Sequence, residues 1–348
     1  MVTENDSIQE EEQELYEHHR FIVDKGQGLL RIDKFLISRL ENVSRSKIQK
    51  AADAGNILVN DIVVKSSYKV KPDDVITVMM SQPVREFKLI AEDIPLDILY
   101  EDNDIIAINK PPGMVVHPAY GNYNGTLVNA LLYHFQQNEE NSGEISTPFL
   151  VHRIDKDTSG VLLVAKNEDA QMKMGKQFFH HTIERKYQAL VWGDVKEDKG
   201  TVVGNIGRSL KNRKVFSVFP NGEYGKDAIT HYRVIERFGY VTLIECQLET
   251  GRTHQIRVHM KYIRHTLFND ENYGGNEILK GTTFTKYKQF VSNCFKICPR
   301  QALHARSLRF EHPITGEEMF FEQPLPDDFS GLIEKWRNYA IHKIEMED

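Results

Sequence analysis

The residues best suited to chemistry gather in one short stretch between two apolar runs. Residues 152–160 read H-R-I-D-K-D-T-S-G and lie between the apolar runs 148–151 and 161–165. Short apolar runs around a turn predict two buried strands, so the charged residues are expected at the rim of a core. There, a guanidinium such as that of Arg153 favours the ionised form of the Asp155 carboxyl group. The stretch predicts a reactive carboxylate, and an ion pair that only closes the strand turn is the alternative.

A second polar stretch, residues 251–260, reads G-R-T-H-Q-I-R-V-H-M. Its apolar and polar residues alternate, which favours a strand with Arg257 and His259 on one face. A helix would instead bring Arg252 and His259 together. No metal-binding spacing such as H-E-x-x-H is present, so we interpret His254 and His259 as hydrogen-bonding supports of strand turns.

Asp155 and Asp157 also fit the D-x-D-T pattern, which resembles the haloacid-dehalogenase family of magnesium phosphohydrolases. That chemistry needs a later acidic pair to hold the metal, and Asp270 and Glu271 lack the glycine that usually precedes it. No P-loop, nucleophile elbow or dinucleotide fingerprint is present either. We therefore expect neither a metal nor a cofactor.

Length and composition favour a protein of two domains. The chain has 348 residues, of which 40% are hydrophobic and 27% charged, as in ordinary globular proteins. No apolar run approaches the roughly 20 residues of a membrane span, and the acidic start is neither a signal nor a transit peptide. Three cysteines are too few for a disulfide framework. We expect a cytoplasmic protein without a membrane partner.

Charge is distributed unevenly along the chain. The net charge is −6, but residues 1–24 alone hold eight acidic residues against Arg20. Residues 25–80 hold ten Lys or Arg against six Asp or Glu. Local charge decides partner choice more than the total does. We expect residues 1–24 to be a disordered acidic tail, and the segment after them to carry a basic surface.

Residues 25–82 predict a small domain of two helices followed by short strands. One helix is expected over residues 31–40, and a second after the N-cap Ser44, ending at Gly55. A hairpin is expected around residues 60–61 and a strand over residues 75–80. The segments R-I-D-K-F-L (31–36), S-R-S-K-I-Q (44–49), A-G-N-I-L-V-N (54–60) and K-P-D-D-V-I (71–76) resemble the S4-type RNA-binding domain. A small basic domain without a ligand is the alternative.

The S4-type resemblance implies an RNA-binding surface on the two helices. Its candidate residues are Arg31, Lys34, Arg45, Lys47 and Lys50. Asp61 and Asp73 stand where the family usually has glycine, so different turns are expected there.

Beyond a linker at residues 83–95, residues 96–330 predict a second domain. Strands are expected over 105–109, 188–192, 232–234 and 241–248, and helices after Thr126 and over 168–179. An insertion-like loop is expected over 276–299 and a short helix over 336–344, inside a C-terminal extension (331–348). The basic segment 204–214 fits either a cradle for a phosphate backbone or a solvated hairpin.

Four motifs in one order resemble the RluA-type pseudouridine synthases, and the first domain and residues 109–132 point to the ribosomal large-subunit branch. They are H-R-I-D-K-D-T-S-G (152–160), R-K-Y-Q-A-L-V (185–191), G-R-T-H-Q-I-R-V-H (251–259) and L-H-A-R-S-L-R-F-E-H-P (303–313). The resemblance covers about residues 25–330. It implies an α+β fold, with a mixed, mostly antiparallel sheet and a central cleft. Ile154 replaces a usual leucine, and residues 268–274 depart from the usual V-G-D-x-x-Y-G.

The resemblance also implies site residues. Asp155 matches the catalytic aspartate, Arg257 its paired arginine, Tyr187 the tyrosine that packs on the target base, and Arg153 an arginine that contacts RNA. Supporting residues are expected around them: His152, Thr158, Gly160, Arg252 and His254.

The implied reaction suits these residue types. Isomerising uridine breaks the bond from ribose C1′ to base N1 and rejoins the ring through C5, which needs no redox change and no cofactor. The carboxylate can attack C1′, attack the ring or remove a proton from C2′, and the sequence leaves these routes open. The expected partner is large-subunit ribosomal RNA or a preribosomal particle, bound by a monomer. The alternatives are a non-catalytic RNA-binding or assembly factor and the magnesium phosphohydrolase.

Overall fold

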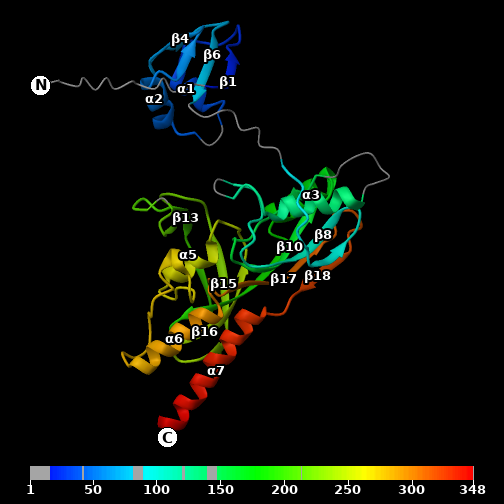
Figure 1. The fold of residues 1–348 in the computed structure, drawn as a ribbon, viewed down its shortest axis with the longest axis vertical. Coiled ribbons are helices and arrows are strands. Elements are labelled where there is room, and N and C mark those ends of the chain that lie inside the picture. Colours follow the sequence, from blue (N-terminus) through cyan, green and yellow to red (C-terminus); the bar gives the residue numbers. More distant parts are fainter. Residues whose placement is uncertain are drawn as a thin grey trace, which may run out of the picture. The chain divides into compact units, whose positions relative to one another are not determined.

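The computed structural model describes residues 16–40, 43–80, 89–119, 122–138, 147–212 and 214–347. Contacts between residues divide the chain into two compact units, residues 1–88 and 89–348 (Figure 1). Most of the predicted acidic tail and part of the predicted linker lie outside the described residues. Within the described part of the chain, no helix is both long and apolar enough to cross a membrane.

The first unit combines two short helices with small antiparallel sheets. One sheet has the order β1-β6-β3-β4, and β2 pairs with β5. The elements are β1 (Tyr16–Ile22), β2 (Leu30–Arg31), α1 (Ile32–Ile37), α2 (Arg45–Asp53), β3 (Ile57–Val59), β4 (Ile62–Val63), β5 (Lys69–Val70) and β6 (Val75–Met80).

The two helices form where the sequence predicts them. Ile32, Phe35 and Leu36 of α1 are buried against Ile48 of α2, at the spacing of one helical face. Ser44 caps α2 by accepting a hydrogen bond from the backbone N–H of Lys47.

One expectation for the first unit is wrong. The sequence predicts a tail up to residue 24, whereas residues 16–22 form β1 and pair with β6. The acidic composition hides a short strand whose backbone completes the sheet. Asp61 and Asp73 replace glycine, yet they adopt the positive φ angles of 65° and 66°. Aspartate tolerates this left-handed region better than most residues, so the substitution still allows left-handed turns there.

The second unit is built on a ten-stranded sheet with the main order β12-β15-β16-β11-β17-β10-β8-β7. β9 and β18 pair at its side with β10 and β17. Its strands are β7 (Ile98–Glu101), β8 (Ile105–Lys110), β9 (Phe149–Leu150), β10 (Ser159–Ala165), β11 (Glu184–Trp192), β12 (Lys199–Val203), β15 (Ile229–Arg237), β16 (Val241–Leu248), β17 (Leu303–Glu311) and β18 (Glu318–Glu322). A separate two-stranded sheet consists of β13 (Asn205–Arg208) and β14 (Phe216–Phe219).

Helices cover both faces of this sheet (Figure 1). They are α3 (Leu127–Asn138), α4 (Glu168–Phe179), α5 (Gln255–Tyr262), α6 (Thr285–Ile297), α7 (Asp327–Glu347) and the 3-10 helix η1 (Glu271–Tyr273). Alternation along β10 sends Leu162 toward α3 and Leu163 toward Met174 of α4. α5 shares a core with α3, whereas α6 and α7 pack together in a second core.

The sheet is mixed because β10 and β17 run parallel, whereas the other strand pairs of the described chain are antiparallel. The parallel pair brings the backbone of Gly160 directly against that of Ala305. Gly160 has a φ of +111°, and a Cβ there would lie 2.2 Å from the Ala305 carbonyl oxygen. Only glycine fits this contact, which fixes the chain just after the charged stretch.

Three expectations for the second unit are wrong. Residues 255–262 form helix α5 rather than a strand, and the predicted loop 276–299 contains helix α6. Residues 331–347 of the predicted extension belong to α7, which starts at Asp327, includes the predicted helix 336–344 and buries Leu332 and Trp336. Tertiary burial decides each case: these helices pack against the sheet, which a local sequence pattern does not reveal.

Candidate active site

The loop that carries Asp155 connects β9 to β10 and borders a cavity of ≈ 510 Å³. The predicted site residues that line this cavity are His152, Arg153, Asp155, Thr158, Tyr187, Arg252, His254 and Arg257. Gly160 lies behind them, in the contact between β10 and β17. The structure therefore brings together residues that are about 100 positions apart in the sequence, such as Asp155 and Arg257.

An ion-pair chain runs from the cavity into the interior. Arg257 Nη1 donates to Asp155 Oδ2 over 2.9 Å. The same guanidinium donates from Nε and Nη2 to both oxygens of Asp270, over 2.7 and 2.8 Å. The side chain of Asp155 is 18% exposed, that of Arg257 3% and that of Asp270 0%. Asp155 is thus the end of the chain that a ligand in the cavity can reach.

Asp270 fixes the position and the charge of Arg257. Burial alone would lower the pKa of Arg257, but the hydrogen bonds and charges of Asp270 and Asp155 raise it above its ordinary value. Because Asp270 accepts from Nε and Nη2 in a bidentate pair, Nη1 of Arg257 remains to donate to Asp155. Sequence reasoning considered Asp270 only as a metal ligand and missed this role. The available signal was that Asp270 matches the aspartate of the V-G-D-x-x-Y-G pattern, although the two residues before it do not match.

Helix α5 places Arg257 inside the protein. His254 starts the helix with a left-handed φ of 57°, and Gln255 ties this start to Thr250 through a hydrogen bond of 2.8 Å. His254 Nδ1 lies 2.9 Å from the hydroxyl of Tyr273, and His259 Nδ1 lies 2.9 Å from Thr230 Oγ1. Both histidines support local structure by hydrogen bonds, although on a helix rather than on strand turns.

Two buried cations hold the backbone that follows Asp155. Lys110 Nζ donates to the carbonyl oxygen of Lys156 over 2.9 Å, and Arg300 Nη1 donates to that of Asp157 over 2.9 Å. Burial lowers the pKa of Lys110 to about 7, against the opposing charge of Asp157. The sequence analysis missed both residues, because each acts through a backbone carbonyl that no motif marks.

Tyr187 and His152 form part of the cavity wall. Tyr187 lies on β11 within the main core, and burial raises the pKa of its hydroxyl. His152 Nε2 accepts a hydrogen bond from the backbone N–H of Leu163 over 2.9 Å. Burial, together with the charge of Arg185, lowers the pKa of His152 to about 3, so the imidazole is neutral at pH 7. His152 therefore supports the loop by its hydrogen bond to the backbone of β10.

The candidate RNA-binding residues of the first unit lie in and beside its two helices. Lys34, Lys47 and Lys50 are exposed. Arg31 and Arg45 both donate to the buried carboxylate of Asp33, whose pKa their hydrogen bonds hold far below its usual range, that of Arg31 most of all. In the second unit, residues 205–208 and 216–219 pair as β13 and β14, and Arg213 lies outside the described residues.

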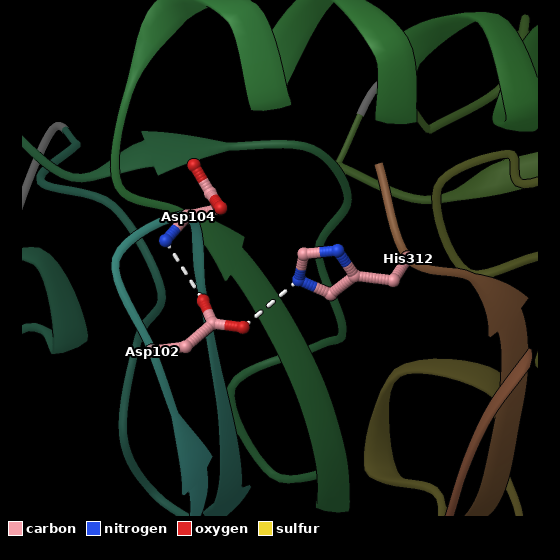
Figure 2. A group of neighbouring side chains, drawn as sticks. All are labelled: Asp102, Asp104 and His312. Atoms are coloured by element: carbon pink, nitrogen blue, oxygen red, sulfur yellow. Dashed lines mark hydrogen bonds and ion pairs between the residues drawn. The ribbon is translucent and has the colours of Figure 1, made fainter. Parts of the chain in front are cut away.

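One group of side chains in the described part of the chain has the spacing of metal ligands: Asp102, Asp104 and His312 (Figure 2). Their atoms already have partners. His312 Nε2 lies 2.9 Å from Asp102 Oδ2, and its Nδ1 accepts from the backbone N–H of Thr315 over 3.1 Å. Asp102 also accepts from Tyr100 and from two backbone N–H groups. These bonds make the group a structural link between β7, β8 and the end of β17.

Known proteins with similar sequences identify the family of this chain. Residues 104–262 match the family model described as RNA pseudouridylate synthase, and residues 30–76 match the S4 domain. An uncharacterized RNA pseudouridine synthase of Chlorobaculum parvum is 46% identical over 90% of this chain and 96% of its own length. The ribosomal large subunit pseudouridine synthase D of Vibrio parahaemolyticus is 42% identical over 88% of this chain and 91% of its own length.

A solved structure supports the fold. The human RNA pseudouridylate synthase domain containing 4 aligns with a TM-score of 0.53, at 23% identity, over 69% of this chain and 92% of its own. The predicted α+β class, with a small N-terminal domain and a mixed, mostly antiparallel sheet, is confirmed.

Proposed function

The chain belongs to the RNA pseudouridylate synthase family, and we propose that it isomerises specific uridines of large-subunit ribosomal RNA to pseudouridine, with Asp155 as the catalytic carboxylate. The observation that carries the proposal is the placement of Asp155 at the cavity, held by the buried Arg257 over 2.9 Å. Relatives named as ribosomal large subunit synthases support the choice of RNA.

Asp155 must be ionised and correctly oriented to react. The guanidinium of Arg257 holds the carboxylate in place by a hydrogen bond to Oδ2, and His254 Nε2 lies 4.0 Å from Oδ1. A carboxylate held in this way serves each of the three routes: attack on ribose C1′, attack on the uracil ring, or removal of the C2′ proton. In every route the bond to N1 breaks, C5 takes the ribose, and the proton on C5 leaves.

A stacked uridine cannot reach this carboxylate, so the nucleotide must flip into the cavity at a cost of a few kcal/mol. Tyr187 lines the cavity and offers an aromatic face to the base. Stacking of this kind contributes roughly 1–3 kcal/mol, enough to offset much of the flipping cost.

The S4-type domain binds the same RNA through its basic surface, and so raises the effective concentration of the target at the cavity. The protein works in this scheme as a cytoplasmic monomer on ribosomal RNA or a preribosomal particle, without a cofactor.

Tritium release from RNA labelled at uridine C5 tests the reaction, because rejoining at C5 expels the label. We expect release by the wild type and by Asp157→Asn, with EDTA present, and none by Asp155→Asn. Phosphate release that EDTA abolishes and that both variants lose, with no tritium release by the wild type, would favour a phosphohydrolase built on both carboxylates. No release by the wild type on naked RNA and on ribosomal precursors would leave a non-catalytic RNA-binding factor.

A further inference from the structure

Arg185 is a buried cation in the wall of the cavity. It lies on β11 two positions before Tyr187, so strand alternation places both side chains on the same face. The residue is 7% exposed and lines the same cavity as Asp155. It is thus within reach of a nucleotide whose base lies against Tyr187.

Arg185 lacks the counter-ion that other buried arginines have. In the described chain the buried arginines are Arg185, Arg257 and Arg300, and the latter two pair with Asp270 and Asp328. The Nη2 group of Arg185 donates only to the backbone oxygens of Glu249 and Leu248, over 3.1 and 3.4 Å. Its buried Nε–H has no acceptor.

A buried guanidinium without a carboxylate is unfavourable for folding. Burial lowers the pKa of Arg185, and the neighbouring charge of Arg252 acts in the same direction. Arg252 and Arg153 also line the cavity, whose one acidic side chain, Asp155, is already paired with Arg257. The cavity wall therefore carries positive charge that the protein does not neutralise.

The guanidinium of Arg185 is held in a fixed orientation. It lies over the ring of Phe178, 5.4 Å from the ring centroid. A Cβ at Gly251 would lie 2.7 Å from Nη1, so the group packs closely against this backbone. A planar donor held in this way is suited to an anion with two oxygens, such as a phosphodiester.

We propose that Arg185 binds the phosphodiester next to the flipped uridine, with Arg252 contributing to the same anion subsite. This inference rests on the proposed function. The phosphodiester of the RNA supplies the negative charge that neutralises the buried guanidinium of Arg185. Arg185 thereby fixes the sugar–phosphate part of the nucleotide while Tyr187 contacts the base. A purely structural role, in which Arg185 only joins β11 to the end of β16, is the alternative.

Salt dependence of RNA binding separates these roles, because each phosphate contact contributes to the slope of log K against log salt. We expect Arg185→Gln to weaken binding about 10-fold at 0.1 M salt and to reduce the slope by about 1. Arg185→Lys should recover part of the affinity. The control Arg233→Gln removes an exposed arginine that pairs with Glu245 away from this cavity, and should bind like the wild type.

A neutral phosphate identifies the linkage. RNA with a single methylphosphonate at each position around the target should lose affinity for the wild type at one linkage, by about the factor seen for Arg185→Gln. Arg185→Gln should lose nothing further at that linkage. Equal losses in both proteins at every linkage would overturn the proposal.

Stability provides the second criterion. Because Arg185 has no counter-ion, Arg185→Gln should keep the melting temperature close to that of the wild type. A lower melting temperature with an unchanged salt slope would establish the structural role.

If Arg185→Gln does not fold, Gly251→Ala displaces the guanidinium without removing its charge. Wild-type affinity in Gly251→Ala would contradict the proposal. Absence of tritium release by the wild type would instead count against the proposed function.

Discussion

The ion pairs among Asp155, Arg257 and Asp270 orient these side chains more than they stabilise the fold. Buried ion pairs recover little more than the free energy lost on removing the charges from water, so they are weak evidence for stabilisation. A guanidinium held between two carboxylates does, however, have a fixed orientation, because each of its N–H groups points at one carboxylate oxygen. Asp270, which is fully buried, orients Arg257, and Arg257 presents one N–H to Asp155. The pair therefore positions the carboxylate that we propose as catalytic.

His304 predicts a pH dependence of stability. Its Nε2 donates to the Gln323 carbonyl oxygen over 3.2 Å, so Nδ1 accepts from the hydroxyl of Ser159, 2.9 Å away. Burial, aided by the charge of Arg300, lowers the pKa of His304 from 6.5 to about 4. The unfolded chain therefore binds a proton between pH 6.5 and 4 that the folded protein does not, and the free energy of unfolding falls as the pH is lowered through this window.

The expected loss is up to about 3 kcal/mol, at roughly 1.4 kcal/mol for each pH unit. Chemical denaturation of wild type and His304→Gln from pH 8 to pH 4 measures it. The variant should lose less stability over this range than the wild type. Parallel curves for the two proteins would show that His304 does not titrate in this way.

Sequence motifs predicted residues of the cavity wall, but they did not predict the residues that hold the loop of Asp155 in place. Asp155, Tyr187 and Arg257 were identified by their motifs, and all three line one cavity. Lys110 and Arg300 were not identified, because they act on backbone carbonyls of residues 156 and 157. Such contacts depend on the fold and leave no spacing in the sequence.

Helix α7 is connected to the loop of Asp155 through a partly buried ion pair. Asp328, in the first turn of α7, accepts from Nε and Nη2 of Arg300 over 2.7 and 3.0 Å. The same guanidinium donates to the carbonyl oxygen of Asp157 and to Ser159 Oγ. The C-terminal helix therefore fixes the backbone of the loop that carries Asp155.

Breaking this pair should reduce turnover. Arg300→Gln leaves Asp328 and the loop carbonyl without their donor, and we expect a loss of about 3–5 kcal/mol in unfolding free energy. The turnover number should fall at least 10-fold with RNA affinity unchanged, since Arg300 does not line the cavity.

Arg337→Gln is the matched control, because Arg337 also joins α7 to the sheet through a bidentate pair, with Glu236. That pair is largely exposed and far from the loop in sequence. The variant should therefore lose less than about 1 kcal/mol in unfolding free energy and keep the turnover number of the wild type. Wild-type turnover in folded Arg300→Gln, or an equal loss in Arg337→Gln, would contradict the connection.

Periodicity was least reliable for the helices near the site. Residues 255–260 alternate in polarity like a strand, but all six are buried in a helix, so their polar groups are satisfied internally and not by solvent. His259, for example, bonds to Thr230 and to the carbonyl oxygen of Gly204. By contrast, α4 extends over residues 168–179 as predicted, because it has one buried face and an N-cap, Asn167. The one buried face of α4 made it readable from sequence, whereas α5, with all of residues 255–260 buried, was not.

At the scale of the molecule, each unit has its own hydrophobic core. The core of the first unit includes Phe35 and Ile76, and the cores of the second include Leu162 and Trp336. We expect residues 89–348 to fold alone. With the basic S4-type domain removed, the Michaelis constant for RNA should rise at least 10-fold and its salt dependence should weaken, whereas the turnover number at saturating RNA should stay within about 3-fold.

A full-length variant in which Lys34, Lys47 and Lys50 are changed to Gln is the control. It should reproduce the rise in the Michaelis constant without removing the domain. A turnover number that falls as much as the affinity would show that the first unit takes part in the chemical step.

The parallel contact between β10 and β17 also determines when the site can form during synthesis. It joins Ser159 to His304, 145 positions later in the chain. Contacts of such long sequence separation are costly in loop entropy and form late in folding. The ribosome must release most of the polypeptide before Arg300 and His304 can support the loop of Asp155. A nascent chain that has exposed only its S4-type domain can thus bind RNA while remaining unable to modify it.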